Sequence, residues 1–277
     1  MPGIIDIGSN SVRLLFGGEK TTIITRLAEN LQRTGRLSEE AISRTHDIVC
    51  GFITRVKSAG EAVHAFGTEP LRAAANADEF IESICRASGV KVEVLSGAEE
   101  AGLAYLGACG GEAGTVIDIG GASVEIISGS GSKILYEKSL PLGAVRLTES
   151  ALPLQEVYGK MSEYGCVPLS GKIYGVGGSF TSLAAMSLGL TEYDSRLVHG
   201  AKLKLGEVQD ILNRLISMKG DIELITTAYP VLQPRRAEII TAGAALALGL
   251  MKYLKTEYIT VSENDNLEGY IIKHLQS

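Results

Sequence analysis

The hydrophobic pattern of this chain begins with two short apolar runs, at 4–7 and 12–15, joined by the small residues Gly8-Ser9-Asn10-Ser11. Such a pair of runs predicts two antiparallel strands joined by a tight turn. Further apolar or alternating runs predict strands over 21–27, 62–66 and 90–95. Helical periodicity lies between them. It predicts helices over 38–57, 69–75, 78–87 and 96–109, the last opened by a capping box of Ser96 and Glu99.

The second half of the chain repeats this order of elements. A hairpin is predicted over 115–128, followed by strands over 133–139, 173–176 and 258–261, with helices from about 144, from about 178 to 186, and over 205–218, 234–250 and from about 266. We therefore expect one domain over 1–113 and a second over 114–265. The last helix, about 266–277, is a candidate to pack back on the first domain.

The two predicted hairpins also match in sequence. Asp6-Ile-Gly-Ser-Asn-Ser-Val recurs as Asp118-Ile-Gly-Gly-Ala-Ser-Val, 112 residues later. An internal repeat of this kind predicts two homologous halves. The order of strands and helices resembles the duplicated ribonuclease-H-like fold of actin, heat-shock chaperones and sugar kinases. That resemblance implies an α/β protein of two domains with a ligand site in the cleft between them.

Composition and charge exclude several classes of protein. Apolar residues make up 45 % and charged residues 21 %, as in soluble globular proteins, and the longest apolar stretch, 242–251, is too short for a membrane span. A net charge of −6 without a basic run argues against a nucleic acid polymer as partner. No basic segment precedes an apolar one at the N-terminus, so we expect a cytoplasmic protein. Its four isolated cysteines are expected to be reduced core residues.

The two turns carry a specific chemical pattern. An Asp at the end of a buried strand projects its carboxylate beyond the sheet, and the following Gly and Ser let backbone N–H groups and hydroxyls approach an oxyanion. Two such turns could hold a metal ion and a phosphate chain. The alternative is a pair of ordinary glycine turns in which Asp6 and Asp118 only form the turn.

Longer motifs resemble those of the exopolyphosphatase and guanosine pentaphosphate phosphatase family. Besides the two turns, they are Gly67-Thr-Glu-Pro-Leu-Arg72-Ala-Ala-Ala-Asn76, Ser96-Gly-Ala-Glu99-Glu100-Ala101, Leu140-Pro-Leu-Gly-Ala-Val-Arg146-Leu, Gly175-Val-Gly-Gly-Ser-Phe-Thr181 and Pro234-Arg-Arg236-Ala-Glu-Ile-Ile-Thr-Ala-Gly243. The resemblance implies hydrolysis of the terminal phosphate of inorganic polyphosphate or guanosine pentaphosphate. It also implies a divalent cation as cofactor, Mg²⁺ first and Mn²⁺ as the other option.

The resemblance assigns catalytic roles to three residues. Glu100 aligns with the catalytic glutamate of the family and is the candidate base for the attacking water, while its neighbour Glu99 is available for the capping box. Adjacent helical residues point about 100° apart, so both roles are compatible. Arg72 resembles the family's phosphate-binding arginine, and Glu125 is expected to share the metal or orient the water. The alternatives are a solvated helix carboxylate for Glu100 and a surface arginine for Arg72.

The metal ligands and the phosphate contacts are expected in the glycine-rich turns. Asp6, Asp118 and Glu125 are the candidate metal ligands, directly or through water. Arg13 occupies the position equivalent to Glu125 in the first half, where an ion pair with a carboxylate is the alternative role. The candidate phosphate contacts are Gly8, Ser9, Asn10, Ser11, Gly120, Gly121, Ala122, Ser123, Gly177, Gly178 and Ser179. For the last three, a purely structural strand–helix turn is the alternative.

The chain departs from the family pattern in places. Ala122 and Val124 stand where the family usually has Gly and Thr, and Asp265 and Leu267 where it usually has Gly and Arg. The chain resembles a short form without helical C-terminal domains, which together with the lack of a basic run predicts a preference for short polyphosphate. Two alternative functions stay open: a nucleotide- or polyphosphate-binding sensor with weak or no catalysis, and an ATPase or kinase of the same fold. A homodimer also stays open.

Overall fold

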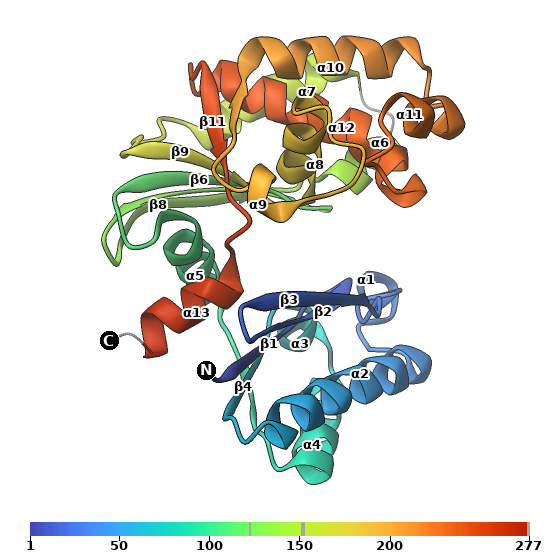
Figure 1. Ribbon diagram of the computed structural model, residues 1–277, viewed down its shortest axis with the longest axis vertical. Coiled ribbons are helices and arrows are strands. Elements are labelled where there is room, and N and C mark those ends of the chain that lie inside the picture. The colour runs from blue at the N-terminus through green and yellow to red at the C-terminus, as the bar shows by residue number, and fades with distance from the viewer. Residues whose placement is uncertain (122, 151–152, 276–277) are drawn as a thin grey trace. The chain divides into compact units, whose positions relative to one another are not determined.

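The computed structural model describes residues 1–121, 123–150 and 153–275 (Figure 1). The chain divides into two compact units. Unit 1 comprises Met1–Leu103 together with the segment that begins at Asn266, and unit 2 comprises Ala104–Asp265. The sequence predicts the first boundary after residue 113. The division falls within helix α5 because Leu103 packs with Leu95 and Leu267 of unit 1, whereas the Tyr105 ring lies against Gly129 of unit 2.

Unit 1 is built on a five-stranded mixed sheet with strand order β3-β2-β1-β4-β5. Strand β1 is antiparallel to β2 and parallel to β4, which is parallel to β5. The strands are β1 Gly3–Ile7, β2 Ser11–Phe16, β3 Glu19–Ile24, β4 Val63–Gly67 and β5 Val92–Val94. The helices are α1 Leu31–Thr34, α2 Glu39–Ser58, α3 Glu69–Ala73, α4 Ala77–Ser88, the first half of α5 Gly97–Cys109, and α13 Asn266–Leu275.

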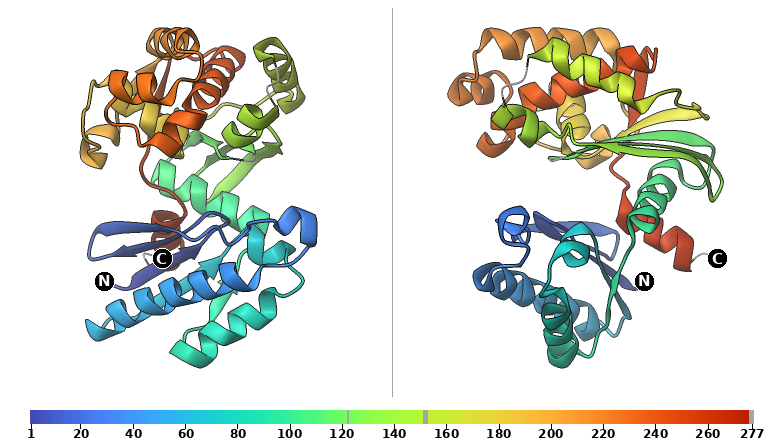
Figure 2. Two further views of the ribbon diagram at one scale, coloured as in Figure 1. Left: turned by 90° about the vertical axis from the view of Figure 1, so that its right-hand side faces the viewer. Right: turned by 180° about the vertical axis from the view of Figure 1, so that it is seen from behind.

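Helices cover both faces of this sheet. Ile5 and Leu14 pack with residues of α2 and α4, which lie side by side against one face (Figure 2). Ile4 and Leu15 point to the opposite face and pack with residues of α5 and α13. Because successive side chains in a strand alternate between faces, a strand covered on both sides is apolar throughout. This explains why β1 is buried at every position.

Unit 2 repeats the same plan with one strand more. Its six-stranded sheet has the order β10-β11-β9-β6-β7-β8. The strands are β6 Gly114–Ile119, β7 Val124–Ser130, β8 Lys133–Leu140, β9 Lys172–Val176, β10 Lys202–Lys204 and β11 Tyr258–Val261. The helices are α6 Ala144–Ser150, α7 Leu154–Lys160, the short 3₁₀ turn Met161–Tyr164, α8 Gly178–Ser187, α9 Ser195–Val198, α10 Leu205–Ser217, α11 Ile222–Ala228 and α12 Pro234–Tyr253.

The order β8-β7-β6-β9-β11 in unit 2 matches β3-β2-β1-β4-β5 in unit 1, which confirms the predicted duplicated ribonuclease-H-like fold. The apolar stretch 242–251 forms the buried core of α12, which packs against α8 and α10 (Figure 1). No helix in the described part of the chain is long and apolar enough to cross a membrane.

Some sequence expectations were wrong in detail. The third strand ends at Ile24 rather than 27, because Arg26 adopts a left-handed backbone conformation with φ 50°. Two of the four cysteines are not core residues: Cys85 and Cys166 are exposed, whereas Cys109 is buried. Burial raises the pKa of the Cys109 thiol to about 12, so this thiol is a poor nucleophile at neutral pH.

Candidate functional site

Three parallel strands of unit 1 end at the same edge of its sheet. The carboxyl ends of β1, β4 and β5 are followed by the turn at 8–11, by Thr68 at the start of α3, and by Ser96 at the start of α5. In open α/β sheets, ligands bind at the carboxyl ends of the strands. Every site residue predicted in unit 1 lies at or next to this edge.

The turn after β1 is held by backbone hydrogen bonds on both sides. The N–H of Gly8 donates to the Ser11 carbonyl at 3.0 Å, and the Asn10 carbonyl accepts from the N–H groups of Thr25 and Arg26 at 3.0 and 2.9 Å. The Ser9 hydroxyl donates to the Glu69 carboxylate at 3.1 Å, which ties the turn to α3. The conformation of the turn is therefore set by the protein itself.

Arg72 and Glu100 meet at the same edge. Nη1 of Arg72 donates to Oε2 of Glu100 at 2.9 Å and to the Leu95 carbonyl at 2.7 Å. Each of the two charged side chains is 29 % exposed, so both remain accessible to a solute. Helix α3 approaches β4 closely, because a Cβ on Gly67 would lie 2.2 Å from the Leu71 side chain. This close packing places Arg72 beside the start of α5.

The capping box at the start of α5 is confirmed. Oε2 of Glu99 accepts from the Ser96 N–H at 2.8 Å and from its hydroxyl at 2.7 Å, and the Glu99 N–H donates to the Ser96 Oγ at 3.2 Å. These hydrogen bonds to the charged form lower the pKa of the Glu99 carboxyl. Glu99 thus has a structural role, and Glu100 is directed elsewhere, to Arg72.

Asp6 and Arg13 are cross-strand partners on β1 and β2. Nε of Arg13 donates to Oδ2 of Asp6 at 3.1 Å, and Nη2 contacts the same oxygen. The Asp6 side chain is 2 % exposed. The alternative role considered for Arg13, an ion pair with a carboxylate, is the one that the structure shows.

In unit 2 the matching pair consists of two carboxylates. Asp118 on β6 faces Glu125 on β7 as its cross-strand partner, and Oε1 of Glu125 accepts a hydrogen bond from the Ser139 hydroxyl at 2.6 Å. Gly177 approaches Asp118 with φ 85°, and a Cβ there would lie 2.6 Å from Oδ1 of Asp118. Only glycine leaves room beside this carboxylate.

The turn after β6 is closed by the same bond as the turn after β1, since the N–H of Gly120 donates to the Ser123 carbonyl at 3.0 Å. The carbonyl of Gly121, at the position equivalent to Ser9, accepts from Val145 and Arg146 at 2.9 and 3.1 Å. Ala122, a predicted phosphate contact, lies outside the described residues.

The Gly177–Gly178–Ser179 turn joins β9 to α8, and a basic residue lies against it. A Cβ on Gly178 would lie 2.4 Å from Nη2 of Arg236, so the guanidinium and the turn are in close contact. Burial lowers the pKa of Arg236. A helix N-terminus with a guanidinium beside it favours an anion. Arg236 was not singled out from the sequence, although it lies in the matched motif 234–243.

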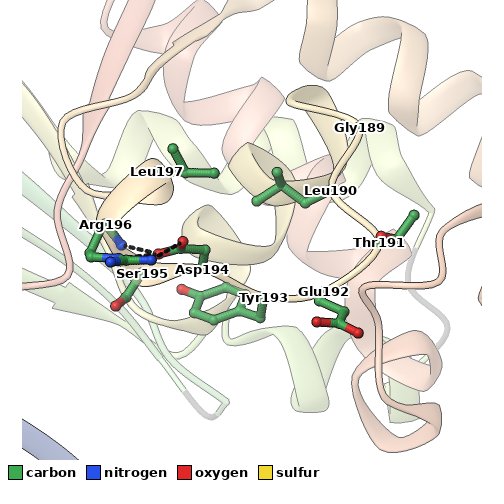
Figure 3. Close-up of a pocket in the computed structure, with 9 residues that line it drawn as sticks. All are labelled: Gly189, Leu190, Thr191, Glu192, Tyr193, Asp194, Ser195, Arg196 and Leu197. Atoms are coloured by element: carbon green, nitrogen blue, oxygen red, sulfur yellow. Dashed lines mark hydrogen bonds and ion pairs between the residues drawn. The ribbon is translucent and has the colours of Figure 1, made fainter.

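A separate open cavity of about 600 Å³ lies on the loop after α8, lined by residues 189–197 (Figure 3). In it, Asp194 pairs with Arg196 at 2.8 Å, and the hydroxyl of Tyr193 donates to the Glu263 carboxylate. Burial is the larger cause that raises the pKa of Tyr193, and this hydrogen bond is the second. The cavity contains none of the predicted site residues.

The predicted metal ligands are divided between the units, Asp6 in unit 1 and Asp118 with Glu125 in unit 2. Within the ranges that the structure describes, no three His, Cys, Asp or Glu side chains gather into a metal-binding cluster. The structure brings together Glu100 with Arg72, Asp6 with Arg13, and Asp118 with Glu125 and Gly177.

Comparisons with known proteins point to one family. A family model described as the Ppx/GppA phosphatase family matches residues 17–277. Exopolyphosphatase 2 of Mycobacterium tuberculosis is 31 % identical over 96 % of this chain and 95 % of its own length. A guanosine-5'-triphosphate,3'-diphosphate pyrophosphatase of Photobacterium profundum is 29 % identical, and this chain spans 58 % of it. The crystal structure of the Aquifex aeolicus Ppx/GppA family member is 30 % identical, with a TM-score of 0.87 over 99 % of this chain and 97 % of that one.

Proposed function

This chain belongs to the Ppx/GppA phosphatase family, as its motifs predicted, and from that premise we propose a specific activity. The protein is a metal-dependent phosphatase that hydrolyses the terminal phosphoanhydride bond of inorganic polyphosphate, short chains in preference, or of guanosine pentaphosphate. The observation that carries the proposal is the 2.9 Å contact between Arg72 and Glu100 at the carboxyl edge of the sheet in unit 1. It joins a proton acceptor to a phosphate-binding cation.

The reaction requires a water molecule that attacks the terminal phosphorus while the bond to the bridging oxygen breaks. Glu100 takes the proton of that water, and the leaving chain departs with the electron pair of the broken bond. Arg72 balances negative charge on the transferred phosphoryl group, and its planar fork suits two phosphate oxygens. The Leu95 carbonyl and Glu100 both hold Nη1, which fixes the orientation of the guanidinium.

The donor set of unit 2 fits a divalent cation. Asp118 and Glu125 present carboxylate oxygens on one face of two neighbouring strands, and Gly177 leaves space beside Oδ1 of Asp118. Oxygen ligands of this kind suit Mg²⁺ and also Mn²⁺. When bound, the cation would supply charge neutralisation for the phosphate oxygens. Asp6 has its Oδ2 engaged by Arg13, so we assign it a role through water rather than as a direct ligand.

The phosphate contacts are assigned to three turns that carry small residues. The matching bonds that close the turns after β1 and β6, Gly8 to Ser11 and Gly120 to Ser123, support a shared role in both units. At the third turn, Arg236 adds positive charge beside Gly178. The residues are Gly8, Ser9, Asn10, Ser11, Gly120, Gly121, Ser123, Gly177, Gly178 and Ser179.

Release of phosphate from a panel of substrates tests this proposal. The purified protein is given tripolyphosphate, long polyphosphate, guanosine pentaphosphate or ATP, each with Mg²⁺, with Mn²⁺ or with excess chelator. We expect release from polyphosphate or guanosine pentaphosphate that stops in chelator, with specificity constants per chain end higher for short polyphosphate than for polymers of hundreds of units. Release from ATP alone would instead indicate an ATPase, and release from none of the substrates would indicate a binding protein.

A further inference from the structure

The basic residues near the two edges of the sheet in unit 1 differ in type. Near the amino ends of β1, β4 and β5 lie both lysines, Lys20, Lys57 and Lys91, and arginines, Arg55 and Arg86. In the described part of the opposite, carboxyl edge, where the candidate site lies, every basic residue is an arginine. They are Arg13, Arg26, Arg33, Arg36, Arg44 and Arg72. A guanidinium can bind two phosphate oxygens at once, so an edge whose cations are all arginines is suited to phosphate.

Three of these arginines are already engaged within the protein. Arg13 binds Asp6, and Arg72 binds Glu100. Arg44 donates from Nε and Nη2 to the Thr25 carbonyl at 3.2 and 3.0 Å and pairs with Glu29 at 3.4 Å.

The other three, Arg26, Arg33 and Arg36, are exposed. Their guanidinium groups make no hydrogen bond or ion pair with any residue that the structure describes. We refer to Arg26, Arg33 and Arg36 as the arginine rim.

The segment that carries the arginine rim is fixed at both ends to the candidate site. At one end, the Arg26 N–H donates to the Asn10 carbonyl at 2.9 Å, in the turn predicted to bind phosphate. At the other end, the Ala75 N–H donates to the Gly35 carbonyl at 3.0 Å, just beyond α3, the helix that carries Arg72. The arginine rim therefore begins at the turn after β1 and continues along the edge of the unit.

Backbone strain accompanies this placement. Arg26 has φ 50°, a left-handed conformation that is unfavourable for a long side chain, whereas Asn30, with φ 61°, is of a residue type that tolerates it. The bond from the Arg26 N–H to Asn10 holds the first of them in place. Strained backbone persists where the surrounding structure maintains it, and such positions cluster at ligand-binding sites.

Acidic residues near the arginine rim have other partners. Glu29 is paired with Arg44. Glu39 and Glu40 lie in the first turn of α2, where the helix N-terminus, capped by the Ser38 hydroxyl at 3.2 Å, favours negative charge. The three rim arginines thus form a local positive surface on a protein whose net charge is −6.

We propose that the arginine rim is a second phosphate-binding surface, which holds the part of a polyphosphate chain that has not yet reached the site of hydrolysis. This proposal rests on the proposed function only in taking polyphosphate as the substrate. Affinity then rises with chain length until the chain passes beyond the arginine rim and gains nothing further.

Binding measured without turnover tests the proposal. Labelled polyphosphate of medium length is titrated, in chelator, with the wild type and with the triple variant Arg26→Gln, Arg33→Gln and Arg36→Gln, at several salt concentrations. The triple variant makes fewer phosphate contacts, so its binding releases fewer counterions. We therefore expect its dissociation constant to be about tenfold higher or more, and the magnitude of its slope of log K against log salt to be smaller by about two to three. Replacement of the same three arginines by Lys should keep the salt slope but lose part of the affinity.

Two controls make the result specific. Arg86→Gln removes an exposed arginine of α4 that is paired with Glu82, away from the carboxyl edge, and should leave polyphosphate binding unchanged. Tripolyphosphate, which is too short to cover the arginine rim, should lose less affinity in the triple variant than the longer chain does. An unchanged dissociation constant and salt slope in the triple variant, or an equal loss in Arg86→Gln, would overturn the proposal. Since the readout is binding, it decides this point even for a protein that hydrolyses none of the substrates.

Discussion

Two adjacent glutamates at the start of α5 have different partners. Glu99 accepts two hydrogen bonds from Ser96, while Glu100 contacts Arg72. The first contact could be predicted from the sequence, because a capping box is local and its spacing is fixed. The second joins residues 28 positions apart and depends on how α3 packs at the end of β4. For the same reason, the sequence did not reveal that Arg236 lies against Gly178.

The assignment of Asp118 as a metal ligand leads to a prediction about metal concentration. Asp118→Asn removes a charged oxygen, so the Mg²⁺ concentration that gives half-maximal phosphate release should rise about tenfold or more. A titration of activity with Mg²⁺ measures this. Asp194→Asn, which alters a half-buried carboxylate paired with Arg196, is the control and should leave the Mg²⁺ dependence unchanged. An unaltered half-maximal concentration in Asp118→Asn would remove this residue from the metal site.

At the scale of elements, segments with a clear period, a cap or a distinct apolar run were predictable, and short segments without such a signal were not. The helices α2 and α10 lie within one or two residues of the predicted bounds, because each has a clear period or a cap such as Ser38. The short strand β11 lies at its predicted bounds because it is a distinct apolar run. The sequence does not predict α9, β10 or α11. These three elements carry too few periods to be recognised, and tertiary contacts such as the pairing of β10 with β11 stabilise them.

Helix α13 packs on α5 at a glycine, which predicts a large effect of a small substitution. A Cβ at Gly269 would lie 1.9 Å from the Leu103 carbonyl oxygen, and this backbone atom cannot move without displacing α5. Gly269→Ala should therefore destabilise unit 1 by about 1–3 kcal/mol, measured by urea unfolding.

The matched control is Gly102→Ala on α5. A Cβ there meets nothing within 4 Å, so the substitution should stabilise the protein by about 0.5–1 kcal/mol. Equal stability of Gly269→Ala and the wild type would show that α13 does not pack as described.

At the scale of the whole molecule, the duplication preserves the backbone and changes the charges. Both turns are closed by an N–H to carbonyl bond of 3.0 Å, Gly8 to Ser11 in unit 1 and Gly120 to Ser123 in unit 2. The next strand carries Arg13 in one unit and Glu125 in the other, each facing an aspartate. Unit 1 therefore has an internally neutralised pair, and unit 2 has two carboxylates suited to a cation.

The repeat in the sequence predicted this duplication, since the same residues recur at a constant offset. The arginine rim was not foreseen, because Arg26, Arg33 and Arg36 are scattered in sequence and form no basic run. Only the bonds of their segment to Asn10 and Ala75 show that they belong to one edge. The net charge of the chain therefore gave no indication of this proposed phosphate-binding surface.

The central claim is that this protein hydrolyses a phosphoanhydride bond with Glu100 as the base. Its most direct test is steady-state phosphate release from tripolyphosphate by the wild type, Glu100→Gln and Glu99→Gln. Because Gln keeps the shape of the side chain but accepts no proton, Glu100→Gln should lower kcat by a factor of about 10² or more with little change in KM. Glu99→Gln should cost far less, because Gln still completes a capping box. A Glu100→Gln variant as active as the wild type, or a loss no larger than that of Glu99→Gln, would contradict the account.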